Sequence, residues 1–239
     1  MNTRREYGII IPNRYPELAL DFIASIKRTH AELPPILVVR DRNTQEYGND
    51  AFVTDGPEPF SFTKNVNIGF KFFTNMDCFV CNDDLECVEK DFFPRLYSIM
   101  CLFPKCGLIS PLIEGGVGNP MQSYHSRARL WEGFPNEVAL KDSTVCFPCV
   151  LISGQLINSI GNLDENLTGY GLDDDDYCIR ARKAGLWTMI TKQLRIKHGN
   201  GGPGTNRGYN YSLSFVRETV MPSDLPYLTT KHSQDKKSA

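Results

Sequence analysis

The chain has 239 residues, which is enough for one large domain or two small ones. Hydrophobic residues make up 41% of it and charged residues 23%, an ordinary balance for a globular protein. The formal net charge of −2 gives no electrostatic footprint for nucleic acid or for an anionic membrane surface. A nucleic-acid partner is therefore not expected.

No targeting segment or membrane span is expected either. Residues 1–7 are polar, and the apolar run after them ends at Pro12, so it is too short for the core of a secretory signal. No stretch approaches the roughly 20 apolar residues of a membrane span. The sequence predicts a soluble, cytoplasmic protein.

The first 40 residues predict a strand, a helix and a second strand. Residues 8–11 are Gly-Ile-Ile-Ile, typical of a buried strand. Pro16 opens a stretch with apolar residues at four-residue spacing, which predicts an amphipathic helix. Residues 36–39, Ile-Leu-Val-Val, predict the second buried strand. This βαβ unit implies a parallel sheet with a right-handed crossover.

The rest of the chain continues to alternate between strands and helices. We expect one domain over residues 1–221 and a polar, partly disordered tail over residues 222–239. Further expected elements are helices at 64–74, 92–103, 154–160 and 173–185, and strands at 51–53, 77–81, 108–111, 145–153, 186–190 and 194–197.

Four cysteines form two CxxC pairs, which raises the question of a zinc site. The pairs are Cys78 with Cys81, and Cys146 with Cys149. Both lie in apolar runs that predict strands, where residues three apart point to opposite faces of the sheet. We interpret these cysteines as small core hydrophobes rather than zinc ligands.

Acidic and amide side chains follow two of the expected strands. Asp41 comes directly after the strand at 36–39, and Asn82-Asp83-Asp84 comes directly after the strand at 77–81. A lone Asp here would be read as capping a turn. Carboxylates at adjacent strand ends instead favour a cation between them, and hard oxygen ligands suit Mg²⁺ or Mn²⁺.

His198 follows a β-like stretch and opens a glycine-rich loop. A histidine in this setting is either a hydrogen-bonded structural residue or, beside an acidic metal site, an imidazole ligand. As a ligand it favours Mn²⁺ over Mg²⁺.

The run Asp173–Asp176 opens the helix expected at 173–185. Asp174 shares a face with apolar residues four and seven positions later, so we expect it to point inward, with Asp175 and Asp176 pointing outward. Adjacent carboxylates raise one another's pKa, which suits a general base. The residues alone leave two readings open, an acidic helix cap and a catalytic base.

Residues 114–143 are polar, glycine-rich and irregular, and they also carry several aromatic side chains. These side chains either stack against the rings of a bound ligand or pack in the core or in a lid. They are Tyr124, His125, Trp131 and Phe134.

In this order, from about Gly8 to His198, the motifs resemble the family 2 glycosyltransferases of the GT-A fold. The resemblance assigns nucleotide contacts to the turn Pro12-Asn13-Arg14, pyrimidine recognition to Asp41, and an Asn-x-Gly helix motif to Asn67. The DXD motif, which binds metal and diphosphate, falls on Asn82, Asp83 and Asp84, and a late metal-binding histidine falls on His198. The acidic run that holds the catalytic base falls on Asp173–Asp176, followed by Arg180.

The resemblance implies a single-domain α/β protein with a mostly parallel sheet flanked by helices. It implies a UDP- or dTDP-linked sugar donor, Mn²⁺ (or Mg²⁺) on Asp84 and His198, and inversion at the anomeric carbon. Register and helix face favour Asp174 as the base, with Asp173 as the alternative. The acceptor would be a glycan, a glycoprotein or a small molecule.

Two other functions are alternatives to this one. A nucleotidyltransferase that makes sugar nucleotides would need a glycine-rich phosphate loop after the first strand, and Pro12-Asn13-Arg14 offers no such glycines. A non-catalytic sugar- or nucleotide-binding protein makes the acidic run at Asp173–Asp176 harder to explain, and the sequence leaves this alternative open.

Overall fold

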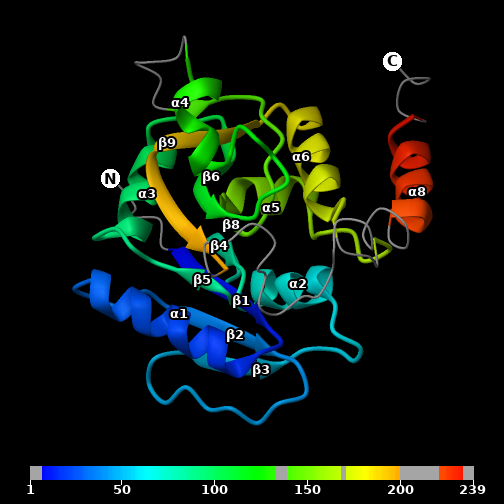
Figure 1. Cartoon of the computed structure of the whole chain (residues 1–239). Coiled ribbons are helices and arrows are strands. Elements are labelled where there is room, and N and C mark those ends of the chain that lie inside the picture. Colours follow the sequence, from blue (N-terminus) through cyan, green and yellow to red (C-terminus); the bar gives the residue numbers. More distant parts are fainter. Residues whose placement is uncertain (1–6, 133–138, 168–170, 200–220, 234–239) are drawn as a thin grey trace.

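A central β-sheet organises the computed structural model, which describes residues 7–132, 139–167, 171–199 and 221–233 (Figure 1). The strands are β1 (Tyr7–Asn13), β2 (Ile36–Arg40), β3 (Phe52–Asp55), β4 (Asp77–Cys81), β5 (Leu85–Glu86), β6 (Cys106–Gly115), β7 (Ala139–Leu140), β8 (Cys149–Ile152) and β9 (Trp187–His198). The helices are α1 (Pro16–Thr29), α2 (Phe62–Phe72), α3 (Phe92–Cys101), α4 (Arg127–Leu130), α5 (Gly154–Ile160), α6 (Asp173–Lys183) and α8 (Met221–Ser233), with a 3-10 turn η1 at Tyr124–Ser126. In the described residues the strand order is β3-β2-β1-β4-β8-β6-β9-β5, and β7 pairs with β9.

One half of this sheet is parallel and contains the βαβ unit. β1 pairs in parallel with β2 and with β4, and β2 pairs in parallel with β3. The register sets Asn13 opposite Arg40, so β1 and β2 end side by side. Residues that follow these strands therefore gather at one edge of the sheet.

The other half of the sheet is mixed, so the prediction of a mostly parallel sheet holds only in part. β8 lies antiparallel between β4 and β6, while β6 and β9 run parallel. The short strands β5 and β7 both pair antiparallel with β9. Apolar runs that are buried on both faces look the same in either orientation, so the sequence pattern carried no signal of strand direction.

Most predicted elements are present with small shifts of their ends. α2 begins at Phe62 rather than residue 64, because the Ser61 hydroxyl accepts a hydrogen bond from the Lys64 amide and caps the helix. The two strands expected at 186–190 and 194–197 form one strand, β9. The register against β6 shifts between Ser110 and Leu112, which marks an irregularity that broke the pattern.

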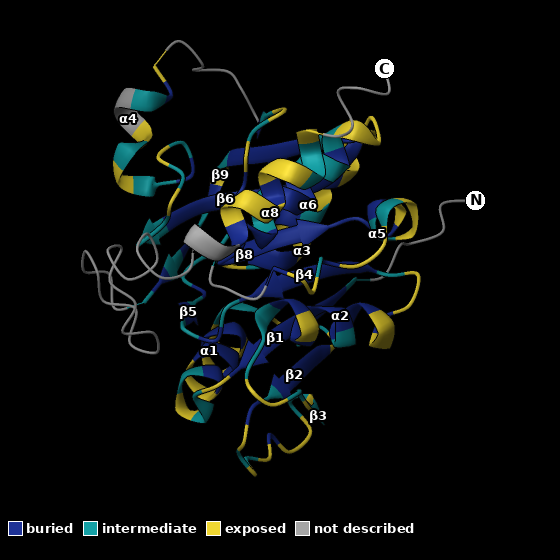
Figure 2. Ribbon diagram, turned by 90° about the vertical axis from the view of Figure 1, so that its right-hand side faces the viewer, coloured by how far each residue is buried: buried dark blue, intermediate teal, exposed yellow. Residues whose placement is uncertain are grey.

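Two apolar layers cover the two faces of the sheet (Figure 2). On one face α1 and α3 bury Phe22, Ile26 and Phe93 against the strands. On the other face α2, α5 and α6 bury side chains that include Val66 and Tyr177. The sheet is thus the middle of three layers. The carboxyl ends of its parallel strands lie together at one edge, where α/β proteins commonly bind ligands.

Three of the four CxxC cysteines pack in these layers, as predicted, whereas Cys146 is half-buried in the loop before β8. Cys78 belongs to the layer under α2, and Cys81 to the layer under α1, so their thiols point to opposite faces. The Cys81 sulfur lies 3.9 Å from that of Cys149 on the neighbouring strand. Burial raises the pKa of Cys78 to about 12, so this group stays a neutral thiol at physiological pH.

Part of the segment that we predicted as a polar tail is a helix. Residues Met221–Ser233 form α8, which lies beside α6, and residues 234–239 lie outside the described residues (Figure 1). The domain division at residue 221 stays a prediction. None of the described helices combines the length and the apolar character needed to cross a membrane.

Gly69 sets how closely α2 packs on β1, and it gives a first prediction. A Cβ atom at this position would lie 2.5 Å from side-chain atoms of the fully buried Ile10. We expect Gly69→Ala to lower the free energy of unfolding by about 1–3 kcal/mol through overpacking, as measured by urea denaturation. Gly118→Ala is the control, because its Cβ would meet Cys146 at an ordinary 3.4 Å, and a comparable loss there would contradict the packing argument.

Candidate active site

The candidate site begins where the parallel strands end. Asn13 closes β1, Asp41 follows β2, and Asn82 follows β4, as the sequence predicted. Pro12 lies within β1 opposite Val39 and is buried. These strands are neighbours in the sheet, so the polar side chains share one edge.

Asp83 holds the turn after β1 in place. Its Oδ2 accepts hydrogen bonds from the Asn13 side chain at 3.0 Å, from the Arg14 amide at 3.1 Å and from the Tyr15 amide at 3.4 Å. The Tyr47 hydroxyl donates to the Asn13 side chain at 3.2 Å. Burial and the charge of Asp84 raise the pKa of Asp83 to about 6, against the lowering effect of these hydrogen bonds. Asp83 is thus a support for the β1 turn.

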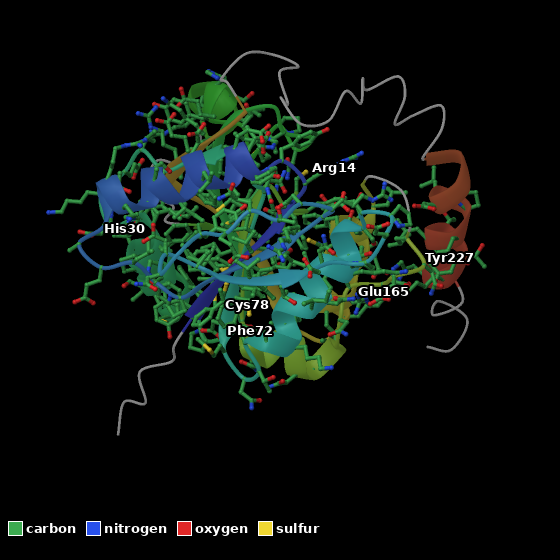
Figure 3. The ribbon with its side chains drawn as sticks, turned by 90° about the horizontal axis from the view of Figure 1, so that it is seen from below. Arg14, His30, Phe72, Cys78, Glu165 and Tyr227 are labelled. Atoms are coloured by element: carbon green, nitrogen blue, oxygen red, sulfur yellow. The ribbon has the colours of Figure 1, made fainter. Side chains whose placement is uncertain are left out.

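Asp41 presents a carboxylate beside two partly exposed arginines. Arg14 Nε lies 3.9 Å from one of its oxygens, and Arg42 Nε lies 3.7 Å from the other. The side chain is 7% exposed, and its Oδ1 has no hydrogen-bond partner among the described residues. A buried acceptor left in this state is costly unless a ligand satisfies it. Figure 3 shows Arg14 at this edge of the molecule.

Asp84 and His198 meet because β5 pairs with β9. The pairing sets Leu85 opposite His198, and the Gly199 amide donates to the Asp84 carbonyl at 2.9 Å. His198 Nε2 then lies 3.3 Å from Asp84 Oδ1, and both side chains are almost completely buried. The two residues predicted to bind metal are therefore adjacent, although they are 114 positions apart in the sequence.

The hydrogen bonds of His198 leave one ring nitrogen available. Its Nδ1 contacts the Gly116 carbonyl, which only accepts, so Nδ1 carries the proton. In the neutral ring, Nε2 then directs a lone pair toward Asp84 and the Asn82 amide, which lies 3.2 Å away. Burial alone lowers the pKa of His198, but the negative charge of the adjacent Asp84 carboxylate outweighs it and raises the pKa.

This pair fits a divalent cation. Neither carboxylate oxygen of Asp84 accepts a hydrogen bond from any described residue. A histidine that donates Nδ1–H to a carbonyl and offers Nε2 has the arrangement found in metal sites. In the part of the chain that the structure describes, no three His, Cys, Asp or Glu side chains gather as a metal cluster. The described residues would supply two ligands to such an ion, Asp84 and His198, and phosphate and water suit the remaining positions.

The acidic run at the start of α6 is buried differently from our prediction. Asp173 and Asp176 are buried, whereas Asp174 and Asp175 are half-buried. The expectation that Asp176 points outward was wrong. It pairs with Arg180 Nε at 2.7 Å and with Lys231 at 2.7 Å, two cations that the helix-face argument did not consider.

Asp173 and Asp174 both have pKa values suited to proton transfer. Burial, followed by the charges of Asp173 and Asp175, holds the pKa of Asp174 well above its usual range. Burial likewise raises the pKa of Asp173 to about 6. The Asp174 carboxylate accepts a hydrogen bond from the Asp175 amide at 2.8 Å.

Arg180, which was predicted to bind the nucleotide sugar, has its guanidinium group engaged within the protein. Arg180 donates to Asp176 and to the carbonyls of Ile160 and Asn162, and its guanidinium lies 4.8 Å from the Tyr177 ring centroid. Arg180 therefore fastens α6 to the turn after α5. Its predicted role in binding the nucleotide sugar stays a prediction.

Asn67 links α2 to the loop that leads to the acidic run. Its amide donates to the Leu163 carbonyl at 3.0 Å and to Glu165 at 2.9 Å, and it accepts from the Leu163 amide at 2.9 Å. The predicted contact of Asn67 with nucleotide is untested, but these bonds give the residue a clear role in joining two motifs.

Solved structures of two other proteins have a similar fold. GalNAc-T7, crystallised with UDP, GalNAc and Mn²⁺, matches with a TM-score of 0.65 at 11% identity, over 86% of this chain and 46% of that one. Residues 1–349 of S. aureus TarS in complex with UDP match with a TM-score of 0.58 at 13% identity, over 80% of this chain and 60% of that one. The chain has a GT-A fold. It spans less than two thirds of the length of either protein, and its sequence matches no protein-family model and no curated protein.

A loop of the GT-A domain connects the strand-end cluster to the acidic run. Gly116, just after β6, accepts from His198, and the backbone of Asn119 hydrogen-bonds to the Cys146 thiol. Burial, and then the charge of Asp174, raises the pKa of Cys146, so Asp174 lies near the far end of this loop. The two predicted clusters therefore border one region.

The aromatic residues expected in this region divide between core and surface. Trp131 is buried, and its indole donates to the Met121 carbonyl at 3.1 Å, so it packs in the core. Tyr124 is half-buried beneath Arg195, whose guanidinium lies 4.8 Å from its ring centroid, and His125 is exposed. Phe134 lies outside the described residues.

The sequence reasoning missed two groups of polar residues at the GT-A site. Tyr47 supports Asn13 from a loop that carries no motif. Lys231 and His232 reach Asp176 from α8, in a segment that we expected to be a polar tail. A helix with an internal proline, Pro226, and little amphipathic pattern gave no signal of its position.

Proposed function

We propose that this chain is a metal-dependent inverting glycosyltransferase that transfers a sugar from a UDP- or dTDP-linked donor to an acceptor hydroxyl. The observation that carries the proposal is the Asp84–His198 pair. It is a buried carboxylate that receives no hydrogen bond from the described residues, beside an imidazole nitrogen with an available lone pair, at the carboxyl edge of a GT-A sheet. Support also comes from the neighbours of the same fold, which hold UDP and, in GalNAc-T7, Mn²⁺.

The donor would lie along the strand ends. Asp84 and His198 would hold Mn²⁺ (or Mg²⁺), and such an ion neutralises charge on a leaving diphosphate. Asp41, with its unsatisfied oxygen, would accept from the imide N–H of the pyrimidine. Asn82 and the turn at Pro12-Asn13-Arg14 would line the nucleotide, while Asp83 holds that turn from below.

Asp174 would act on the acceptor. It stands at the first turn of α6, half-buried, with a raised pKa that suits a base working near neutral pH. It would remove the proton from the acceptor hydroxyl, whose oxygen attacks the anomeric carbon from the face opposite the diphosphate. The bond from that carbon to the diphosphate oxygen breaks in the same step, and the nucleoside diphosphate leaves. Asp173 is the alternative base, with a pKa raised to about 6, but it is more deeply buried.

A non-catalytic nucleotide-binding protein is the second candidate, and one observation favours it. Asp176 of the acidic run has its carboxylate engaged within the protein, by Arg180 and Lys231. On that view the acidic run stabilises the packing of α6 and α8 and has no catalytic role. A nucleotidyltransferase remains disfavoured, because the β1 turn has no glycines for a phosphate loop.

Binding and hydrolysis together test the proposal. We expect UDP or dTDP to raise the melting temperature only when Mn²⁺ or Mg²⁺ is present, and ADP to have no such effect. At about 100 times the Kd the ligand would add about 2.7 kcal/mol of stability. A panel of UDP- and dTDP-sugars should also show slow release of the nucleoside diphosphate. Binding without hydrolysis or transfer would favour the non-catalytic candidate, and no binding of either nucleotide would exclude both.

A further inference from the structure

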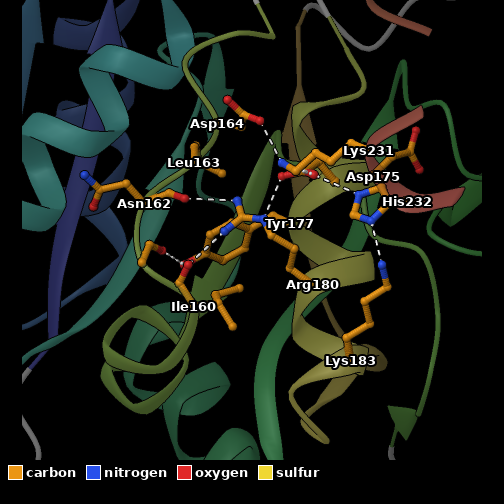
Figure 4. Close-up of polar contacts among 12 residues, drawn as sticks. Ile160, Asn162, Leu163, Asp164, Asp175, Tyr177, Arg180, Lys183, Lys231 and His232 are labelled. Atoms are coloured by element: carbon orange, nitrogen blue, oxygen red, sulfur yellow. Dashed lines mark hydrogen bonds and ion pairs between the residues drawn. The ribbon is translucent and has the colours of Figure 1, made fainter. Parts of the chain in front are cut away.

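Helix α8 fastens the acidic run to the preceding loop. Lys231 Nζ lies 2.7 Å from Asp164 Oδ2 and 2.7 Å from Asp176 Oδ1, so one ammonium group joins that loop to the first turn of α6 (Figure 4). The Tyr227 hydroxyl donates to the same Asp164 oxygen at 2.8 Å. Figure 3 shows Glu165 and Tyr227 on one side of the molecule.

His232 adds a second contact from α8, and its tautomer follows from its partners. Lys183 Nζ lies 2.8 Å from His232 Nδ1, and an ammonium group only donates, so Nδ1 accepts. Nε2 of the ring therefore carries the proton and donates to Asp176 Oδ1 at 2.9 Å. Together with Arg180 on the other oxygen, Asp176 accepts from three side chains of two helices.

These contacts are unlike an ordinary ion pair on the surface. The Asp176 side chain is fully buried and that of Asp164 is 12% exposed, so solvent screens them little. Burial raises the pKa of Asp164, but the hydrogen bonds from Lys231, Asn166 and Tyr227 outweigh it and hold the pKa well below its usual range. The Asp164 carboxylate is therefore charged where it meets Lys231.

The contacts form a continuous connection to the candidate base. Asn67 on α2 fixes the loop at Leu163 and Glu165, and Lys231 fixes the same loop to Asp176. Asp176 lies in the first turn of α6, two residues after Asp174. The position of this turn relative to α2 therefore depends on α8.

We propose that Lys231 is a positioning residue for the reaction: it holds the first turn of α6 so that Asp174 faces the acceptor. The inference rests on the proposed function, because it gives Asp174 the role of base. It assigns a part in turnover to the C-terminal helix, whose Lys231 contacts Asp164 and Asp176 rather than the residues at the strand ends.

The test compares Lys231→Met with Lys231→Arg, which keeps the charge. We expect Lys231→Met to lower kcat for donor hydrolysis or transfer by roughly 10- to 100-fold, since a small misplacement of a catalytic group has effects of that size. KM for the donor should stay within about twofold, because the strand ends do not change. Lys231→Arg should recover most of kcat. Lys27→Met is the matched control. Lys27 on α1 forms an exposed ion pair with Asp50, so this variant should behave as the wild type.

Amide hydrogen exchange gives a second measurement that does not need activity. The amides of the first turn of α6 should exchange faster in Lys231→Met than in the wild type or in Lys27→Met. If Lys231→Met does not fold, Tyr227→Phe removes a single hydrogen bond to Asp164 and should show the same changes to a smaller degree.

The outcomes separate this inference from the proposed function. An active wild type in which Lys231→Met leaves kcat unchanged, or in which donor KM rises instead of kcat falling, would overturn the positioning role. A wild type without activity on any donor would contradict the proposed function and the role in turnover together, and faster exchange in Lys231→Met would then support only the contact between α8 and α6.

Discussion

Asp174→Asn is expected to lower transfer to the acceptor by about 10²- to 10⁴-fold, the usual contribution of a general base. The Asn side chain has nearly the same shape but cannot take up the proton. Its carbonyl oxygen can still accept the hydrogen bond from the backbone amide of Asp175. Binding of UDP and metal should be unchanged, because Asp174 lies on α6 and not at the strand ends. Initial rates at saturating donor, together with calorimetric titration of UDP, measure the two effects.

Neighbouring aspartates provide matched controls for this result. Asp175→Asn changes an equally half-buried carboxylate of the same turn, and it should retain activity within a few-fold. Asp173→Asn tests the alternative base. Normal turnover in Asp174→Asn with inactive Asp173→Asn would transfer the role to Asp173, and full activity in both would refute a base in this run.

The pH dependence of turnover should have its acidic limb well above the usual range of an aspartate. A base works only when it is ionised, so activity is lost as pH falls through the raised pKa of Asp174. Burial is the first cause of that shift, and the charge of Asp175 adds to it. Asp175→Asn removes this charge, so the limb should move to lower pH in a profile of kcat against pH.

Asp84→Ala is expected to reduce Mn²⁺ affinity and donor affinity together, each by at least about 100-fold. Loss of a residue that only supports a metal ligand already costs about 10- to 100-fold, and Asp84 would be a ligand itself. Titration of Mn²⁺ with and without UDP measures both. Glu86→Gln is the control, because Glu86 lies two residues away but pairs with Arg28 and Lys197 at 3.8 and 3.3 Å.

The same variant should have the opposite effect on stability. Because no described residue donates a hydrogen bond to the Asp84 carboxylate, its burial costs free energy in the metal-free protein. Asp84→Ala should therefore unfold at an equal or higher temperature than the wild type when metal is absent. With Mn²⁺ added, only the wild type should gain stability. A strong loss of stability in metal-free Asp84→Ala would indicate that the residue is structural.

The sequence correctly predicted that these polar residues follow the strands, for a local reason. A buried strand followed at once by Asp41 or by Asn82-Asp83-Asp84 places those side chains at the sheet edge wherever the strand is. The adjacency of Asp84 and His198 depended on a pairing between distant strands, β5 with β9, and only the family resemblance suggested it.

The acidic run shows where the sequence argument stopped. Helix periodicity predicted that Asp176 lies on the solvent-facing side of α6, because the prediction was based only on the apolar residues of the same helix. In the structure Arg180 of that helix and Lys231 of α8 accompany Asp176 into the interior. A charged residue is buried when its partners are buried with it, and partners from a remote segment leave no pattern in the local sequence.

The hydrogen bonds of Asp83 make the two ends of the proposed donor site a single mechanical unit. The residue before the proposed metal ligand Asp84 is bonded to the amides of Arg14 and Tyr15, which shape the turn expected to touch the nucleotide. A shift of the turn after β4 thus displaces the turn after β1. Recognition of the nucleoside and coordination of the diphosphate would accordingly be adjusted together. A nucleoside bound correctly at the turn after β1 would align the turn after β4, which carries the groups for the diphosphate.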